Sequence, residues 1–153
     1  MNVYEQLLSS SDENIIVIEK QFKSKAKGLC KGNKIGISAD IDTSTEKACV
    51  LAEELGHHYT TVGNIIDMTN AQNRKQERQA RLWAYNKQIG LRGIIRAFNH
   101  GCSNPHEIAE YLEVTEEFLH EAINCYREKY GVYTTVENYI IYFIPNLTVG
   151  ERI

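Results

Sequence analysis

A short segment in the first half of the chain combines two carboxylates and an imidazole at helical spacing. Glu53 and Glu54 are adjacent, and His57 follows Glu53 by four residues. Residues four apart lie on one face of a helix, so the side chains of Glu53 and His57 can converge. In the H-E-x-x-H pattern of helical zinc sites, two ligands stand one turn apart and the intervening Glu acts on water at the metal. Glu53 stands where the first His would be, Glu54 where the general base would be, and His57 where the second His would be.

Two predicted helices must position these side chains. Residues 43–46 read Thr-Ser-Thr-Glu, which has the capping-box form and predicts a helix from there to about Tyr59. Its apolar face consists of four small or aliphatic residues, Ala48, Leu51, Ala52 and Leu55. Residues 60–70 are predicted as a loop. A second helix is predicted over residues 72–88, and it aligns Glu77 with Ala80 and Ala84.

Residues 52–57 read A-E-E-L-G-H, and residues 77–84 read E-R-Q-A-R-L-W-A. Together they resemble the ImmA/IrrE family of metallo-endopeptidases. The metal helix of that family reads A-H-E-L-G-H, and its third ligand lies on the next helix in the pattern E-x-x-A-x-x-(F/W)-A. The resemblance covers about residues 27–88, and this chain departs from the pattern at Glu53.

The resemblance implies a zincin-like peptidase with Glu53, His57 and Glu77 as metal ligands. The metal would polarise the scissile carbonyl and lower the pKa of its water, and Glu54 would accept that proton and pass it to the leaving amine. Zinc is the expected cofactor. Manganese is the alternative, because two carboxylate ligands suit a harder ion. The implied substrate is a protein, a helix-turn-helix repressor encoded beside the enzyme on a prophage or similar mobile element.

The Glu at position 53 leaves two other interpretations open. In one, Glu53 is an ordinary surface acid and the site holds no functional metal, so the protein is a non-catalytic interaction module for a repressor-like partner. Its binding surface would then be the acidic helices of residues 107–121, which would bind a basic partner. In the other, His58 supplies a ligand and Glu54, one turn earlier, is its partner. That register places Leu55 at the position of the general base, so it could bind metal without catalysing as described.

Length and composition indicate one soluble globular domain. The chain has 153 residues, of which 42% are hydrophobic and 24% charged, and its net charge is −3. The absence of a global basic excess argues against wholesale binding of nucleic acid or of an anionic membrane. No apolar run is long enough to span a bilayer, and the first residues lack a signal-peptide pattern, so a cytoplasmic location is expected. The four cysteines are far apart and are expected to be reduced.

The segment that precedes the helix predicted from residue 43 has the pattern of β-strands. The β-branched residues 15–18 predict a buried strand, and Gly32-Asn33 predicts a two-residue hairpin turn within residues 29–38. That hairpin is the candidate sheet edge for an extended substrate. Six lysines and no acidic residue occur between Lys20 and Lys34. They indicate either a solvated edge strand protected from aggregation or a site for an anionic partner.

The last third of the chain predicts helices and a strand. Helices are expected over residues 91–99, 105–112 and 115–130, and the last two have the rhythm of a helix-turn-helix. The second of these opens with Glu116 and Glu117, and no Lys or Arg lies between Glu107 and Ile123, so direct nucleic-acid binding is not expected. Residues 132–144 predict a final strand that ends before Pro145.

The expected architecture is therefore α+β. A small mixed or antiparallel sheet and a zincin-like metal-helix pair are followed by a helical subdomain and a C-terminal strand. We expect residues 1–153 to form a single domain, with a peptidase core in residues 1–88, a helix-turn-helix-like subdomain in residues 89–131, and the strand and tail in residues 132–153. The sequence leaves the oligomeric state open.

Overall fold

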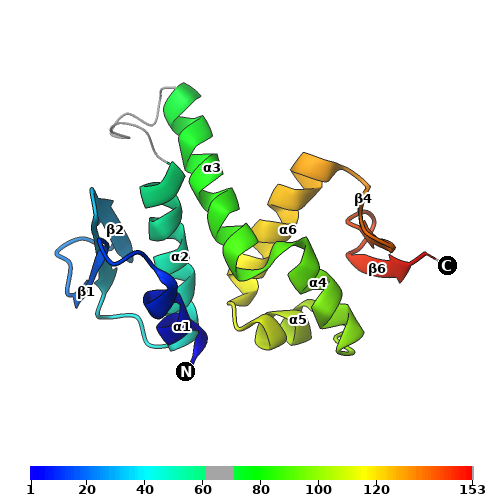
Figure 1. The fold of residues 1–153 in the computed structure, drawn as a ribbon, viewed down its shortest axis with the longest axis horizontal. Coiled ribbons are helices and arrows are strands. Elements are labelled where there is room, and N and C mark those ends of the chain that lie inside the picture. The colour runs from blue at the N-terminus through cyan, green and yellow to red at the C-terminus, as the bar shows by residue number, and fades with distance from the viewer. Residues whose placement is uncertain (61–70, 153) are drawn as a thin grey trace. The chain divides into compact units, whose positions relative to one another are not determined.

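The protein has an α+β fold, as its sequence predicts (Figure 1). The structure is a computed structural model that describes residues 1–60 and 71–152. The chain divides into two compact units, Met1–Ala84 and Tyr85–Ile153, and the boundary falls within helix α3. The loop predicted over residues 60–70 lies almost entirely outside the described residues. None of the described helices combines the length and the apolar character that a membrane crossing requires.

The first unit contains a three-stranded sheet and three helices. The helices are α1 (Val3–Ser10), α2 (Ser44–Thr60) and α3 (Ala71–Gln88), and the strands are β1 (Ile16–Lys20), β2 (Gly28–Lys31) and β3 (Lys34–Ser38). The sheet order is β1-β3-β2, with β1 parallel and β2 antiparallel to β3. Gly32 begins the β2–β3 turn with a φ of 61°, a conformation that glycine adopts without strain, so the predicted hairpin is confirmed.

The inner face of this sheet packs against the helices. Ile35 and Ile37 on the central strand β3 are 1% and 0% exposed, and α2 contacts both β2 and β3. Helix α1 packs on α2 in turn. The sheet therefore buries one face under α2, and this packing fixes how α2 lies relative to β2.

Two expectations about the strands were wrong. The β-branched run was predicted to be buried, and Ile15 is buried, but Ile16 and Ile18 are 47% and 48% exposed, because β1 is an edge strand and these two side chains point away from the helices. The hairpin was expected to be the sheet edge as a whole, but of its two strands β3 is central and only β2 lies at an edge. A run of β-branched residues indicates a strand without showing that both of its faces are covered.

Glu19 on β1 links the sheet to two helices. The hydroxyl of Tyr4 on α1 donates a hydrogen bond to Glu19 Oε1 at 2.9 Å, and the Lys47 ammonium on α2 lies 3.2 Å from the same oxygen. The hydrogen bond from Tyr4, followed by the one from Lys47, lowers the pKa of Glu19. This carboxylate is exposed, so solvent screens the interaction and its contribution to stability is small.

Replacing Glu19 with Gln should lower the free energy of unfolding at pH 7 by less than about 1 kcal/mol. Because the folded-state pKa is lowered, the contribution of Glu19 is present above its ordinary pKa of 4.5 and is lost as the pH falls through the folded value. Denaturant titrations at pH 7 and pH 3 should therefore show a difference that shrinks in acid. Glu13→Gln, an exposed change in the preceding turn, serves as the control. An equal pH dependence for the two variants would contradict this assignment.

The second unit contains three helices and a three-stranded antiparallel sheet. The helices are α4 (Gly90–Asn99), α5 (Pro105–Leu112) and α6 (Glu116–Tyr130), and the strands are β4 (Tyr133–Val136), β5 (Tyr139–Tyr142) and β6 (Thr148–Glu151). Sequence signals located both later helix starts correctly. Asn104 caps α5 by accepting the N–H of Glu107 at 2.9 Å, and Thr115 caps α6 by accepting that of Phe118 at 3.1 Å.

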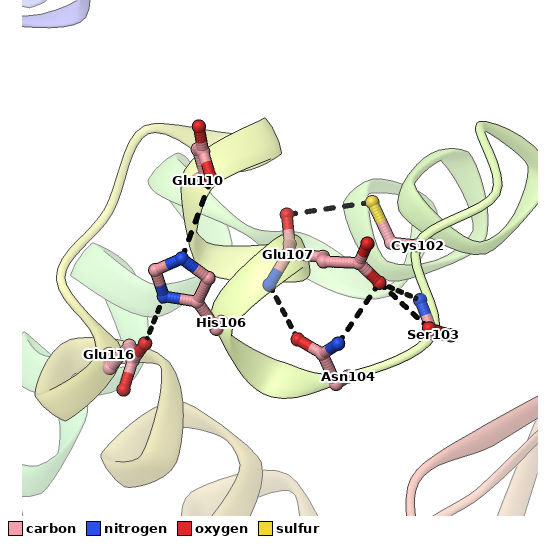
Figure 2. Close-up of polar contacts among 7 residues, drawn as sticks. All are labelled: Cys102, Ser103, Asn104, His106, Glu107, Glu110 and Glu116. Carbon is pink, nitrogen blue, oxygen red and sulfur yellow. Dashed lines mark hydrogen bonds and ion pairs between the residues drawn. The ribbon is translucent and has the colours of Figure 1, made fainter.

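Helices α5 and α6 occupy the two segments predicted as a helix-turn-helix-like pair, and acidic side chains meet an imidazole where α6 begins. Figure 2 shows His106 between two carboxylates: its Nδ1 lies 2.6 Å from Glu116 at the start of α6, and its Nε2 lies 3.7 Å from Glu110 on α5. The hydrogen bond with Glu116 raises the pKa of His106. The imidazole therefore joins the two helices of the pair through their acidic side chains.

The predicted C-terminal strand is two strands. Residues 132–144 form the hairpin of β4 and β5, which turns at Glu137 with a φ of 54°. Strand β6 then pairs with β5 beyond Pro145. No Gly or Pro marks this turn and a Glu in the left-handed region is uncommon, so the sequence pattern does not indicate it.

Candidate functional site

The buried face of helix α2 determines where its candidate functional residues lie. Thr43 caps the helix by accepting the N–H of Glu46 at 3.1 Å, as the capping signal predicts. All four predicted core residues of the helix, Ala48, Leu51, Ala52 and Leu55, are at most 1% exposed. This packing fixes the rotation of the helix about its axis. Glu54 is held inside the fold, and Glu53 and His57 are partly exposed.

The structure brings His57 of α2 together with Glu77 of α3. His57 Nε2 lies 3.3 Å from Glu77 Oε2, and both side chains are 22% exposed. The hydrogen-bonding contact with Glu77 raises the pKa of His57, against the opposing effect of burial. The same contact lowers the pKa of Glu77, and Arg81, whose Nε donates to Glu77 Oε1 at 3.3 Å, adds to that effect. Two residues predicted as ligands from separate motifs are therefore neighbours.

A close approach of the two helices places this pair. Gly56 has no side chain, and a Cβ at this position would collide with the Ala80 carbonyl oxygen and lie 3.0 Å from the carbonyl carbon. Further along the same helices, the rings of Tyr59 and Trp83 have centroids 5.2 Å apart. Gly56 thus lets α2 and α3 approach at the positions beside His57 and one turn after Glu77.

Glu54 is a buried carboxyl group with an unsatisfied oxygen. It is 9% exposed, and its Oε2 has no hydrogen-bond partner among the described residues. Burial raises its pKa to about 7; the charges of Glu53 and Glu77 also raise it, whereas His57 lowers it. A carboxyl group with a pKa near neutrality can both accept and release a proton at physiological pH. Perturbed acids of this kind concentrate at functional sites.

Strand β2 passes directly beside Glu54, which the sequence analysis did not predict. A Cβ at Gly28 would lie 2.9 Å from Glu54 Cγ and 2.7 Å from Val50 Cγ1, so only glycine fits without movement. Cys30, two residues along the same strand, also faces this region: burial raises the pKa of its thiol and the charge of Glu54 raises it further. The available signal was the glycine within a strand pattern, which marks a close backbone approach.

The other two candidate ligands are placed differently. His58 Nδ1 lies 2.9 Å from the Gly32 carbonyl oxygen, and since a carbonyl oxygen can only accept, the Nδ1–H is the donor. This hydrogen bond holds the His58 ring against the β2–β3 turn. The charge of Glu53 raises the pKa values of both Glu54 and His57. No group of three His, Cys, Asp or Glu side chains is arranged to hold a metal within residues 1–60 and 71–152. The structure therefore joins two of the predicted ligands and does not complete a set of three.

The His57–Glu77 pair fits a zinc ion in ligand type and in spacing. Two ligand atoms of one tetrahedral zinc, each about 2.0–2.1 Å from the metal, are about 3.3–3.4 Å apart. The observed separation of 3.3 Å matches that value. It is longer than the roughly 2.7–2.9 Å of a good charge-assisted hydrogen bond. The donor set of imidazole and carboxylate is one that zinc accepts in proteins.

A model of one protein family, described as the IrrE N-terminal-like domain, matches residues 11–124, well over half of the chain. The chain belongs to this family. The IrrE N-terminal-like match includes the first sheet, α2, α3 and the helices of the second unit through most of α6. Membership confirms the resemblance drawn from the two helix motifs, and it supports a metallopeptidase-type protein with a metal cofactor. No curated protein and no solved structure matches the chain.

Proposed function

We propose that this IrrE N-terminal-like protein is a metal-dependent endopeptidase. One observation carries the proposal: the buried carboxyl of Glu54, with an unsatisfied oxygen, belongs to the same electrostatic cluster as the His57–Glu77 pair. A buried polar atom without a partner is costly to keep in a fold. Its position beside two residues of metal-ligand type is explained if Glu54 performs chemistry there.

His57, Glu77 and Glu53 would hold the metal. Zinc is the proposed ion, and manganese is the alternative because two of the three ligands are carboxylates. When bound, a divalent metal supplies Lewis acidity that polarises the scissile carbonyl and activates water. Binding would require His57 to be neutral, so metal affinity should fall in acid as this side chain becomes protonated.

Glu54 would move the proton. Its free Oε2 accepts a proton from the attacking water, and the same oxygen then delivers it to the nitrogen of the leaving amine. Burial holds its pKa near 7, so neither transfer is strongly uphill at neutral pH. The side chain keeps its place because the buried face of α2 fixes the rotation of its helix and β2 passes beside it at Gly28.

The substrate would be a protein segment in extended form. Within the described residues, no strand pairs with the outer edge of β2, and this edge runs past Glu54. An extended peptide can add to such an edge through backbone hydrogen bonds. The family resemblance supports a helix-turn-helix repressor of a mobile element as the substrate. It also supports the cytoplasm as the location of this protein.

Metal analysis of purified protein tests the ligand assignment. We expect about one zinc or manganese ion per chain by elemental mass spectrometry, because a site of this type binds a single ion. Replacing His57, Glu77 or Glu53 with Ala should each weaken metal binding by more than about 100-fold, the upper range for losing only an outer-shell partner. His58→Ala is the matched control, since His58 is on the same helix and bonds to Gly32.

Three outcomes would contradict parts of the assignment. Unchanged metal content in Glu77→Ala would remove Glu77 from the ligand set. Loss of metal in His58→Ala with retention in Glu53→Ala would replace Glu53 by His58. If no metal binds even after zinc or manganese is added, the non-catalytic interaction module becomes the better account of the protein.

A further inference from the structure

The outer face of the first sheet carries an exposed apolar row. Side chains alternate across a strand, so the residues next to the inward-facing Gly28 and Ile37 point outward. The register places Ile18 of β1 and Leu29 of β2 on either side of Gly36 of the central strand. Ile18 is 48% and Leu29 53% exposed. Ile16, 47% exposed, lies on the same face one row away.

Phe22 completes this surface from the segment after β1. A Cβ at Gly36 would lie 3.1 Å from Cζ and 3.2 Å from Cε1 of Phe22, so the ring rests on the middle of the sheet where the glycine leaves space. The Lys20 ammonium lies 5.9 Å from the centre of that ring. The ring thus lies between the two exposed aliphatic side chains and forms one continuous apolar strip with them.

Lysines border the strip on both sides. Lys31 and Lys34 are paired in the neighbouring row on one side, the row that also holds Ile16, and Lys20 lies in the neighbouring row on the other side, opposite Ser38. All three are exposed, and none forms an ion pair with a residue that the structure describes. The whole protein has a net charge of −3, so this positive border is a local feature.

Protection of edge strands explains only part of this arrangement. Lysines on an edge prevent sheets from pairing side by side, which accounts for charge along β1 and β2. It does not account for the large aliphatic side chains in a row across the open face. Polar side chains at these positions would leave the edges equally well protected. Apolar patches with a polar rim on soluble proteins mark interaction sites.

We propose that this outer face, formed by Ile16, Ile18, Phe22 and Leu29 with Lys20, Lys31 and Lys34, is a docking surface for an acidic protein segment. The segment would place apolar side chains on the strip and carboxylates against the lysines. Charge complementarity selects an acidic partner. The row of aliphatic groups selects a polypeptide over a nucleic acid, whose phosphates would meet hydrocarbon there.

The surface is separate from the proposed catalytic site. Gly28 faces Glu54, and the next residue, Leu29, faces the opposite side of the sheet. Docking therefore needs neither a metal nor Glu54, and its test is independent of peptidase activity. A segment bound to this face leaves the edge of β2 and the carboxyl of Glu54 uncovered.

Selection from a random peptide display library against the full chain tests the proposal. Peptides that contain Asp or Glu around Leu, Ile or Phe should be enriched, and a synthetic copy of an enriched peptide should bind in solution. Its affinity should fall as salt rises, since exposed charges contribute to binding. Single-stranded DNA and anionic lipid vesicles serve as parallel probes of the same protein.

Matched variants locate the binding. The double variant Ile18→Ser with Leu29→Ser should weaken binding of the selected peptide by about tenfold or more. Replacement of Lys20, Lys31 and Lys34 with Glu should weaken it by a similar factor. The controls are Val132→Ser with Ile144→Ser, two apolar residues 52% and 43% exposed in the second unit, and reversal of Lys75, Lys87 and Lys129. Thermal unfolding of each variant shows whether it is folded.

The results separate cleanly. Loss of binding in the outer-face variants with retention in the controls supports the docking surface. Enriched peptides without acidic and apolar residues, or equal binding by the outer-face variants, would overturn it. Tighter binding of DNA or of vesicles through these same residues would also overturn it, in favour of that other partner class.

Discussion

Glu54→Gln should lower the rate of peptide cleavage by about a hundred- to ten-thousand-fold, the range associated with a positioned general acid–base group. The amide has nearly the shape of the carboxyl but cannot accept the proton of the attacking water. The proposed ligands are on other residues, so metal content should stay the same. Cleavage of a labelled protein substrate in the presence of zinc or manganese measures the effect.

The same substitution should stabilise the metal-free protein at high pH. The pKa of Glu54 is raised from an ordinary 4.5 to about 7, so the folded state holds this proton more tightly than the unfolded state does. The contribution of Glu54 to the free energy of unfolding therefore falls as the pH rises from about 4.5 to about 7. Gln carries no such charge, so the variant should gain relative stability at pH 8 and little at pH 4.

Glu46→Gln is the control for both measurements. Glu46 lies on the same helix, where it pairs with Lys27 near the surface. Its replacement should change neither cleavage nor metal content. Full activity in Glu54→Gln would remove Glu54 from the catalytic step, and loss of metal in that variant would make it a ligand instead.

Gly56→Ala should destabilise the protein by about 1–3 kcal/mol, which is typical of overpacking. The added methyl group would meet backbone atoms of Ala80, with the carbonyl carbon at 3.0 Å and Cα at 3.3 Å, and backbone cannot rotate away as a side chain can. Separation of α2 from α3 would also draw His57 away from Glu77. We therefore expect a lower midpoint of chemical denaturation together with weaker metal binding.

Gly93→Ala provides a matched control within a helix. A Cβ there would lie 3.5 Å from the nearest atom, on Leu112, which is an ordinary contact. Replacing a helical glycine with alanine then favours the helix by up to about 1 kcal/mol. Opposite signs for the two variants are the expected result. Equal stabilisation of both would show that the close approach at Ala80 is not tight.

The sequence contains enough information to predict the pair of helices that forms the site. Thr43 and the apolar periodicity of residues 48–55 indicate the start and the buried face of α2, and a second motif places Glu77 on the next helix. Each signal is local, because a cap or a period depends on residues within a few turns. The contact of His57 with Glu77 follows once the two helices pack.

Long-range features could not be predicted in this way. The exposure of Ile16 depends on which strand pairs with β1 and on what covers its outer face, and neither is written in the residues of β1. The approach of Gly28 to Glu54 joins positions 26 residues apart, and a single glycine in a sequence does not indicate which residue it will approach. The turn between β4 and β5 has Asn138 as its one typical turn residue, and the residue in the left-handed region is Glu137, which does not usually mark a hairpin.

The two glycines at the close approaches to α2, Gly28 on β2 and Gly56 on α2 itself, differ in how evolution can change them. At position 28 the obstacles are side chains, Val50 and Glu54 itself, so a smaller residue at position 50 would make room for part of an added methyl group. At position 56 the obstacle is a carbonyl oxygen, which every amino acid carries. A residue other than glycine can therefore be accommodated at position 28 together with a second substitution at position 50. No single substitution elsewhere would make room for a side chain at position 56.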